Sequence, residues 1–490
     1  MRCVGSDKLH PSSDDLALLP AHAQRALYAQ GVLSPVDILR AQIARFETEN
    51  PSINAVTFSH FDTAMEAAKT SEARYRSGKA RELEGITVAI KDEFARTGWT
   101  VTSGSKVLVK ETAEENHPVI GKLLDAGAIL HLQTTAPEFF LIGETWSDLW
   151  GVTRNPWNLA CTPGGSSGGS AAALAAGMTT LAIGSDMGGS IRIPCALTGL
   201  YGSKPSYGRV PSSDPSSLVT HASIGPLARE LRDLALLQNI MMGPAFSAPA
   251  TLDPKLEIPL EPELKSWKLA FSVDQGWARL DSDVRLTMKE AVELFKEAGA
   301  IVEQIDLPLG IKDRQLRDTI EKAIFSTTIG AQLLEYKSEM AQLTTYGRRF
   351  VELASRLGPS DAKDAAEETL RLFKIIEEHV FAAGYDALLT PTIATTRIPA
   401  AFDATSDMIE IEGLSVDPYC GWFLTSVFSL LNWMPVITVP AGIASNGVPT
   451  GLQIVTRPYQ DSTCFEIAAA YSKKWRLAAA NWPTSSHRQR

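Results

Sequence analysis

The feature that most constrains this chain is a pair of serines in glycine-rich segments, Ser166 and Ser190, which stand 24 positions apart. The first lies within Pro163-Gly164-Gly165-Ser166-Ser167-Gly168-Gly169, and the second directly follows Met187-Gly188-Gly189. Glycine permits positive φ and close backbone approach, so such segments can form turns that present main-chain N–H groups beside a hydroxyl. A serine with amide donors beside it suits acyl transfer, because an oxyanion forms where a carbonyl oxygen was.

A serine hydroxyl also needs a base, and Lys91 is the candidate. It follows the apolar, β-branched run Ile86-Thr87-Val88-Ala89-Ile90, which is typical of a buried strand. Burial disfavours the charged form of a lysine and lowers its pKa, which would make a neutral, basic amine available. Taken alone, a lysine after a buried strand more often extends its charged end into water. The two serine segments downstream favour the catalytic interpretation.

One alternative concerns which serine is the nucleophile. Residues 164–168 also satisfy the G-x-S-x-G pattern of the nucleophile elbow in α/β-hydrolases, with Ser166 at its centre. That motif needs a strand directly before the serine, whereas residues 155–163 include two prolines and are typical of a loop. Covalent labelling that falls on Ser166 alone would favour the elbow.

Charge and composition exclude some classes of partner. The 490-residue chain is 44% hydrophobic and 21% charged, as in ordinary globular proteins, and carries a formal net charge of −10. This balance argues against nucleic acid and anionic membranes, both of which require a basic patch. The first eight residues lack the apolar core of a signal peptide, and no apolar run is long enough to cross a bilayer. We therefore expect a cytoplasmic protein.

The cysteines and histidines give no pattern of a disulfide framework or a metal site. The five cysteines are few and widely scattered, at Cys3, Cys161, Cys195, Cys420 and Cys464. The eight histidines show no metal-ligand spacing. We expect free thiols in a reducing compartment and no metal ion.

Alternating helical and strand patterns predict the fold class. Helical patterns cover 14–47, 61–77, 117–126, 170–177, 282–298 and most of 311–382. Strand patterns cover 86–90, 129–132, 180–184, 269–272, 301–302, 387–390, 436–439 and 451–455. Within 14–47, Ser34 and Pro35 suit the start of the second of two helices. The alternation favours an α/β fold with helices on the faces of a sheet.

Longer segments around these serines and the lysine resemble the amidase signature family. The matching segments are Gly151–Pro156, Pro163–Gly177, Gly184–Pro194, Gly199–Pro205, Thr390–Thr392 and Asn432–Gly442. The resemblance covers most of 80–245 and 385–470, and it implies a large mixed β-sheet covered by α-helices on both faces. Residue 185 is serine where many members have threonine. Residues 311–382 follow no family pattern that we can place.

The resemblance also implies roles for individual residues. Ser190, Ser166 and Lys91 would form a Ser-cisSer-Lys triad. The amides of the oxyanion hole would be those of Met187, Gly188, Gly189 and Ser190. Asp186 and Arg192 would brace this loop by a charge pair, although exposed pairs of this kind contribute little stability.

By the same resemblance, residues 1–490 form a single domain. It would consist of N-terminal helices (1–79), a core that carries the triad (80–245), a helical region that shapes the substrate site (246–384) and C-terminal core strands with a helix (385–490). We expect loops around Trp99, residues 139–150, Trp157 and residues 311–432 to form the pocket. The apolar side chains of Phe139–Ile142, Trp146 and Trp150 suit an apolar or aryl acyl group, or simply the core.

Members of the family cleave primary amides, anilides, fatty amides, cyclic oligoamides, carbamates and glutamine. The resemblance implies a serine amidohydrolase that forms an acyl-enzyme on small amides, with aryl amides and carbamates (urethanes) as expected substrates. The finer resemblance is to free-standing bacterial amidases, which include urethane-cleaving members. The alternative is the glutaminase subunit of a tRNA-dependent amidotransferase. Neither function implies a cofactor, and a homodimer is one expectation because many relatives form homodimers.

Overall fold

A computed structural model describes residues 13–212, 218, 220–262, 265–475 and 482–483. Cys3 and the first eight residues, considered above, lie outside this part of the chain. The other four cysteines are buried and free. Within the described residues, no helix is long and apolar enough to cross a membrane, and no group of three His, Cys, Asp or Glu side chains could hold a metal ion.

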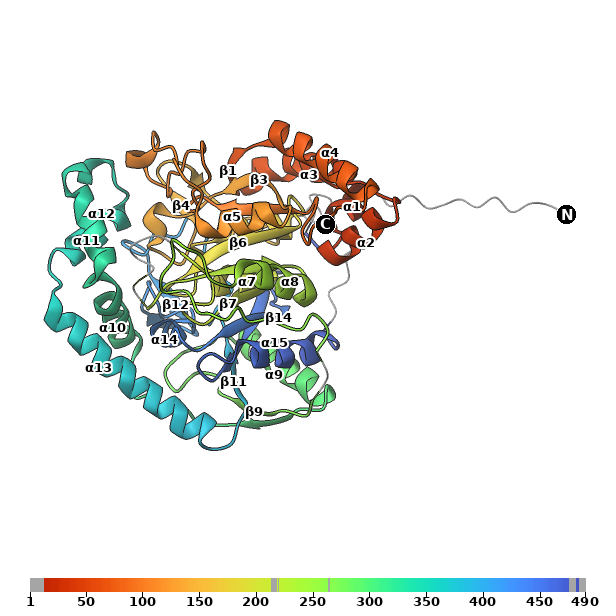
Figure 1. The fold of residues 1–490 in the computed structure, drawn as a ribbon. Coiled ribbons are helices and arrows are strands. Elements are labelled where there is room, and N and C mark those ends of the chain that lie inside the picture. The colour runs from red at the N-terminus through yellow and green to blue at the C-terminus, as the bar shows by residue number, and fades with distance from the viewer. Residues whose placement is uncertain (1–12, 213–217, 219, 263–264, 476–481, 484–490) are drawn as a thin grey trace.

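One large sheet forms the centre of the molecule (Figure 1). Its strands are β1 (Val56–Ser59), β2 (Thr87–Lys91), β3 (Ile129–Thr134), β6 (Leu181–Asp186), β7 (Tyr201–Lys204), β8 (Ser223–Ala228), β9 (Lys268–Phe271), β10 (Ile301–Gln304), β11 (Ala387–Pro391), β14 (Val436–Ile443) and β15 (Pro449–Thr456). Two short hairpins pair β4 (Trp146–Ser147) with β5 (Gly151–Val152), and β12 (Ile409–Ile411) with β13 (Leu414–Val416).

The helices precede, separate and follow these strands. They are α1 (Ser13–Leu18), α2 (Ala21–Ala29), α3 (Pro35–Ile53), α4 (Phe61–Arg76), α5 (Pro118–Asp125), α6 (Gly168–Ala175), α7 (Arg192–Thr198), α8 (Leu231–Met241), α9 (Ser282–Glu297), α10 (Asp313–Phe325), α11 (Thr328–Leu334), α12 (Thr345–Ala354), α13 (Pro359–Ile376), α14 (Ser426–Leu430) and α15 (Asp461–Ser472). Short 3-10 helices cover Lys106–Leu108, Glu138–Phe140 and Glu335–Gln342, and a π-helical turn covers Glu377–Phe381.

The eleven strands lie in the order β1-β3-β2-β6-β8-β7-β14-β15-β11-β9-β10. Neighbours β3, β2 and β6 are parallel, as are β11, β9 and β10, whereas the remaining pairs are antiparallel. The sheet is therefore mixed, and the predicted fold class is confirmed.

Burial of both faces explains why the central strands are continuous apolar runs. In β2, Val88 and Ile90 pack in a cluster that includes Val119 of α5, whereas Ala89 packs in another cluster with Ala172 of α6. Successive side chains of a strand point to opposite faces, so helices must cover both. β2 thus runs through the core and ends at Lys91.

The segment 14–47, predicted to form two helices, forms three. Pro20 has an extended conformation between α1 and α2, because a proline cannot continue the preceding helix. The predicted start at Ser34 is confirmed, since its Oγ accepts from the amide of Asp37 at 3.3 Å and its amide donates to the Asp37 carboxylate at 2.9 Å. This reciprocal pair is a capping box, and α3 then continues to Ile53.

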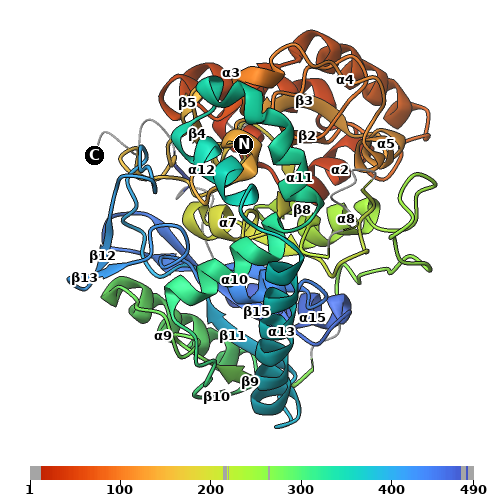
Figure 2. The same ribbon diagram turned by 90° about the vertical axis from the view of Figure 1, so that its left-hand side faces the viewer.

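Helices α10–α13 form a wall along one side of the molecule (Figures 1 and 2). This confirms that 311–382 is mostly helical. Residues of α10 and α13 pack against strands β9 and β11, while Phe325, Leu333 and Phe350 form a separate cluster around α11 and α12. The second cluster lies beside the cavity described below.

Candidate active site

The site lies at the carboxyl ends of two parallel neighbours, β2 and β6. Lys91 is the last residue of β2, and Asp186 is the last residue of β6. Carboxyl ends of parallel strands meet at the same edge of a sheet, where ligands commonly bind in α/β folds. This topology brings Lys91 to the beginning of the second glycine-rich segment.

The Lys91 side chain is fully buried and surrounded by three oxygens. Its Nζ lies 2.8 Å from Ser166 Oγ, 2.9 Å from Ser185 Oγ and 3.1 Å from a carboxylate oxygen of Glu93. Burial lowers the pKa of Lys91 below its ordinary value, although the Glu93 carboxylate opposes this shift. The amine is therefore displaced towards its neutral, basic form.

Ser166 lies in the loop before α6, and its side chain is buried. The peptide bond between Gly165 and Ser166 is cis. A Cβ at Gly165 would lie 2.2 Å from the carbonyl oxygen of Glu144, so only glycine fits there. The amide of Ser167 donates to the carbonyl of Ser190 at 3.1 Å, which holds the two serine segments together.

The Ser190 segment is shaped by contacts to Asp186 and Thr425. The amide of Gly189 donates to an Asp186 carboxylate oxygen at 2.9 Å, and Thr425 Oγ1 donates to the carbonyl of Gly188 at 2.6 Å. Of the four amides expected in an oxyanion hole, that of Gly189 thus already has an acceptor. Those of Met187, Gly188 and Ser190 have none among the described residues.

Asp186 and Arg192 form a buried, bidentate pair, with N–O distances of 2.8 and 2.9 Å. Both side chains are fully inaccessible to solvent. Burial alone would raise the pKa of Asp186, but the Arg192 guanidinium outweighs it and the pKa lies below its ordinary value. Arg192 also donates to the Gln453 side chain and to Ser429, so it ties the loop to β15 and α14. The pair is a buried anchor rather than an exposed one.

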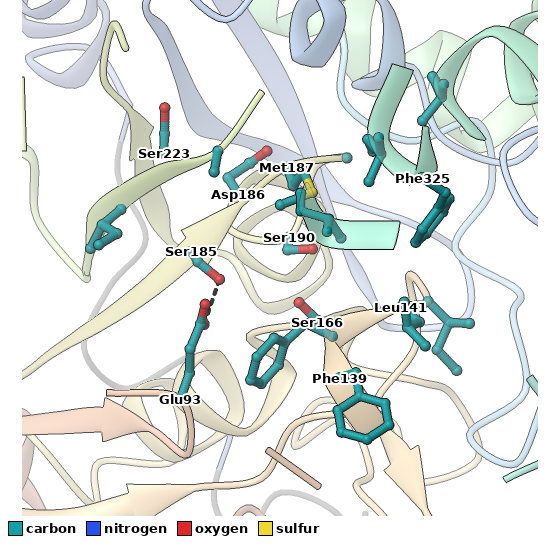
Figure 3. Close-up of a pocket in the computed structure, with 18 of the residues that line it drawn as sticks. Glu93, Phe139, Leu141, Ser166, Ser185, Asp186, Met187, Ser190, Ser223 and Phe325 are labelled. Atoms are coloured by element: carbon teal, nitrogen blue, oxygen red, sulfur yellow. Dashed lines mark hydrogen bonds between the residues drawn. The ribbon is translucent and has the colours of Figure 1, made fainter. Parts of the chain in front are cut away.

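A cavity of about 480 Å³ opens beside both serines. In Figure 3, Ser166 and Ser190 lie between two unlike walls. The mainly apolar wall comes from the 3-10 helix at 138–140, the residues after it, and α10–α12, which also contribute Arg317, Glu321 and Gln332. Its labelled members in Figure 3 are Phe139, Leu141 and Phe325. The opposite wall carries the polar side chains of Glu93, Ser185 and Ser223 among apolar ones.

The expected pocket residues are only partly those that line the cavity. Phe139–Ile142 do line it, as do parts of the 311–432 region. Trp99, Trp146, Trp150 and Trp157 do not. These indoles pack elsewhere: Trp99 stacks on His60, Trp146 packs against Tyr346, Trp150 donates to Thr102 and Trp157 donates to the carbonyl of Thr198.

Two neighbours of Lys91 were missed by sequence reasoning, Glu93 and Ser185. Glu93 stands two positions after Lys91, and an extended chain would place both on one side, so its position was a usable signal. Ser185 precedes Asp186 at the end of β6, but only the β2–β6 register shows that it reaches Lys91.

Comparison with known proteins identifies the family. The family model described as "Amidase" matches residues 37–465. The chain belongs to the amidase signature family. Acylamidase of Rhodococcus erythropolis is 32% identical to it over 466 residues, covering 94% of this chain and 96% of the relative. The crystal structure of a bacterial aryl acylamidase of the amidase signature family superposes with a TM-score of 0.83 at 28% identity, covering 93% and 97% of the two chains.

The amidase family also includes subunits of larger enzymes. A glutamyl-tRNA(Gln) amidotransferase subunit of Symbiobacterium thermophilum is 30% identical over 488 residues, covering 93% of this chain and 96% of that protein. The chain is therefore an amidase-family hydrolase of amide bonds. Its sequence is similar both to an acylamidase and to an amidotransferase subunit, at 32% and 30% identity.

Replacing Arg192 tests the buried anchor. Arg192→Met leaves the Asp186 carboxylate buried without its counter-charge, so we expect the free energy of unfolding to fall by about 3–5 kcal/mol in urea denaturation. Arg76→Met is the matched control, because Arg76 forms an exposed pair with Glu72 at 2.7 Å, and it should cost less than about 1 kcal/mol. Equal losses in the two variants would contradict the anchoring role.

Proposed function

We propose that this chain is a serine amidohydrolase in which Ser190 attacks the substrate, Ser166 relays protons and Lys91 is the base. The observation that carries the proposal is the contact between Lys91 Nζ and Ser166 Oγ, at 2.8 Å and out of contact with solvent. A buried amine with a lowered pKa can accept a proton, and a hydroxyl can both donate and accept.

The reaction then proceeds in two halves. Ser190 attacks the carbonyl carbon while its proton passes to Ser166 and the Ser166 proton passes to Lys91. Ser166 returns a proton to the leaving nitrogen, which departs as an amine and leaves an acyl-Ser190 ester. Water then attacks the ester, with the same groups acting in reverse. A bridging serine lets one lysine serve both the nucleophile and the leaving group.

Charge on the carbonyl oxygen is stabilised by the loop at 187–190. The amides of Met187, Gly188 and Ser190 are available, whereas that of Gly189 donates to Asp186. One donor to an oxyanion is typically worth about 3–4 kcal/mol of transition-state stabilisation. The Asp186–Arg192 pair acts here by holding the loop in position.

The two walls of the cavity support a substrate class. Phe139, Leu141 and Phe325 suit an aryl or alkyl acyl group, and we assign the leaving amine to the opposite side, which carries Glu93, Ser185 and Ser223. Similarity to an acylamidase and an aryl acylamidase supports the same choice. A carbamate differs from an amide by one oxygen on the acyl side, so ethyl N-(4-nitrophenyl)carbamate belongs in the substrate screen beside 4-nitroanilides.

The second candidate function is glutamine hydrolysis within an amidotransferase complex, which the similarity to the Symbiobacterium protein supports. The apolar side chains of the acyl wall argue against it, because the polar amino-acid end of glutamine would lose its hydration beside them. Arg317 and Glu321 of α10 also line the cavity, however, and are charged partners for such a group. Release of 4-nitroaniline by the isolated chain, with no ammonia from glutamine, favours the free-standing amidase. The reverse result favours the amidotransferase.

The role of Ser190 is tested by a fluorophosphonate, a probe that phosphonylates active serines. We expect the wild-type label on the peptide that contains Ser190. Ser190→Ala should not be labelled, and its amidase activity should fall about a thousandfold or more, because the nucleophile is gone while the fold persists. Ser338→Ala, at an exposed serine, is the control and should behave as wild type. Undiminished activity in Ser190→Ala would refute the assignment.

The acyl wall is tested by Leu141→Ala, assayed on the 4-nitroanilides of hexanoic and acetic acid, which share a leaving group. Loss of buried apolar contact should lower kcat/KM for the hexanoyl substrate about tenfold and leave the acetyl substrate nearly unchanged. Leu414→Ala, at a half-exposed leucine of β13, is the matched control. Equal effects on both substrates would place the acyl group elsewhere.

A further inference from the structure

The closest polar surroundings of Lys91 hold two groups to which the catalytic scheme gives no role, the Glu93 carboxylate and the Ser185 hydroxyl. Among the described residues, the Lys91 Nζ has three close polar neighbours: it is hydrogen-bonded to Ser166 and Ser185 and forms an ion pair with Glu93 at 3.1 Å. The ring of Phe140 covers another side, with its centroid 4.3 Å from Nζ. Whether each neighbour donates or accepts a hydrogen bond therefore decides where the N–H groups and the lone pair of the amine point.

Glu93 and Ser185 are both obliged to accept from Lys91. The Ser185 Oγ lies 2.6 Å from the Glu93 carboxylate oxygen (Figure 3), and an ionised carboxylate can only accept. Ser185 must donate its single proton to Glu93. Its oxygen is then left to accept from Lys91, and the same Glu93 oxygen accepts from Lys91 directly.

A neutral lysine has two N–H groups and one lone pair. If Ser185 and Glu93 take the two N–H groups, the lone pair faces the third neighbour, Ser166. We propose that Glu93 is a positioning residue that, together with Ser185, aims the lone pair of neutral Lys91 at the Ser166 hydroxyl. The inference rests on the proposed function, in which that hydroxyl gives its proton to Lys91.

The same arrangement suits the protonated state. When the Ser190 proton moves to Ser166 and the Ser166 proton moves to Lys91, the lysine becomes an ammonium with three N–H groups. Each then has an acceptor, at Ser166, Ser185 and Glu93. The Glu93 carboxylate also balances a positive charge that forms out of contact with water, where an unpaired charge is costly.

The local chain directs Glu93 to this position. Asp92, between Lys91 and Glu93, is buried and accepts from the amide of Thr102 at 3.0 Å, so it fixes the turn away from the cavity. Glu93 lies on the cavity wall with a quarter of its side chain exposed. The other charge that acts on Lys91 is Asp186 on β6, which is already paired with Arg192.

The test measures the rate of fluorophosphonate labelling of Ser190 against pH, which requires no knowledge of the natural substrate. Labelling needs neutral Lys91, so the rate falls as pH drops through the pKa of Lys91. Glu93→Gln removes the charge that raises this pKa, so the acid limb should move to lower pH by about one pH unit. The plateau rate should fall about tenfold, because Lys91 is a weaker base and is less well oriented.

Companion variants separate charge from orientation. Glu93→Asp keeps the charge and should keep the acid limb close to that of wild type. Ser185→Ala keeps the charge but removes one acceptor, so the plateau should fall without a downward shift of the limb. Glu335→Gln removes another cavity-lining carboxylate that does not contact Lys91, and it should leave the acid limb in place.

Circular dichroism and thermal unfolding check that the Glu93→Gln protein is folded. The proposal is overturned if this folded variant has the same acid limb and the same plateau of labelling rate as wild type. If that variant does not fold, a wild-type plateau in Ser185→Ala overturns it instead. Lys91→Ala separates this failure from that of the catalytic scheme. If Lys91→Ala is labelled at the wild-type rate, Lys91 is not the base and the catalytic scheme itself is wrong. If Lys91→Ala is not labelled, a negative result for Glu93→Gln refutes only the role of Glu93.

Discussion

The structure around the site depends on one buried amine. Lys91 ends a strand that is packed on both faces, and its Nζ is held by Ser166, Ser185 and Glu93 without contact with solvent. A charged lysine in such a place is costly, and a neutral one needs acceptors for its N–H groups. The surrounding oxygens meet that need in either protonation state, which supports the proposal that Lys91, a residue type ordinarily found as a surface cation, serves as a base.

Much of the architecture follows from sequence patterns with a simple physical cause. The strand before Lys91, the alanine-rich helix α6 and the C-terminal strands were all predicted, because each is an apolar run whose burial is required by its composition. Strand β8 was not predicted. Its Gly225 and Pro226 are unfavourable in strands, and the structure shows why glycine is needed: a Cβ there would lie 2.0 Å from the carbonyl oxygen of Ser203.

The residues of the site that lie in recognisable sequence motifs could be predicted. Lys91, Ser166 and Ser190 were brought together from their sequence context, and the structure places both serines on one cavity and Lys91 against Ser166. Partners set by strand register or by helix packing were not accessible: Ser185 beside the lysine, and the side chains of α10–α12 on the acyl wall. Glu93 could have been found from its spacing to Lys91. The tryptophans expected in the pocket are half-buried and pack elsewhere, since aromaticity alone does not show which side chains line a pocket.

The proposed function depends on acyl transfer to Ser190 with Lys91 as the base. The most direct measurement is to mix the enzyme with hexanoyl 4-nitroanilide, quench with acid within the first turnover and locate the added acyl mass by peptide mapping. We expect a hexanoyl group on Ser190, formed as 4-nitroaniline is released and absent from Lys91→Ala. A hexanoyl group on Ser166, or turnover with no acylated serine, would contradict the proposed function.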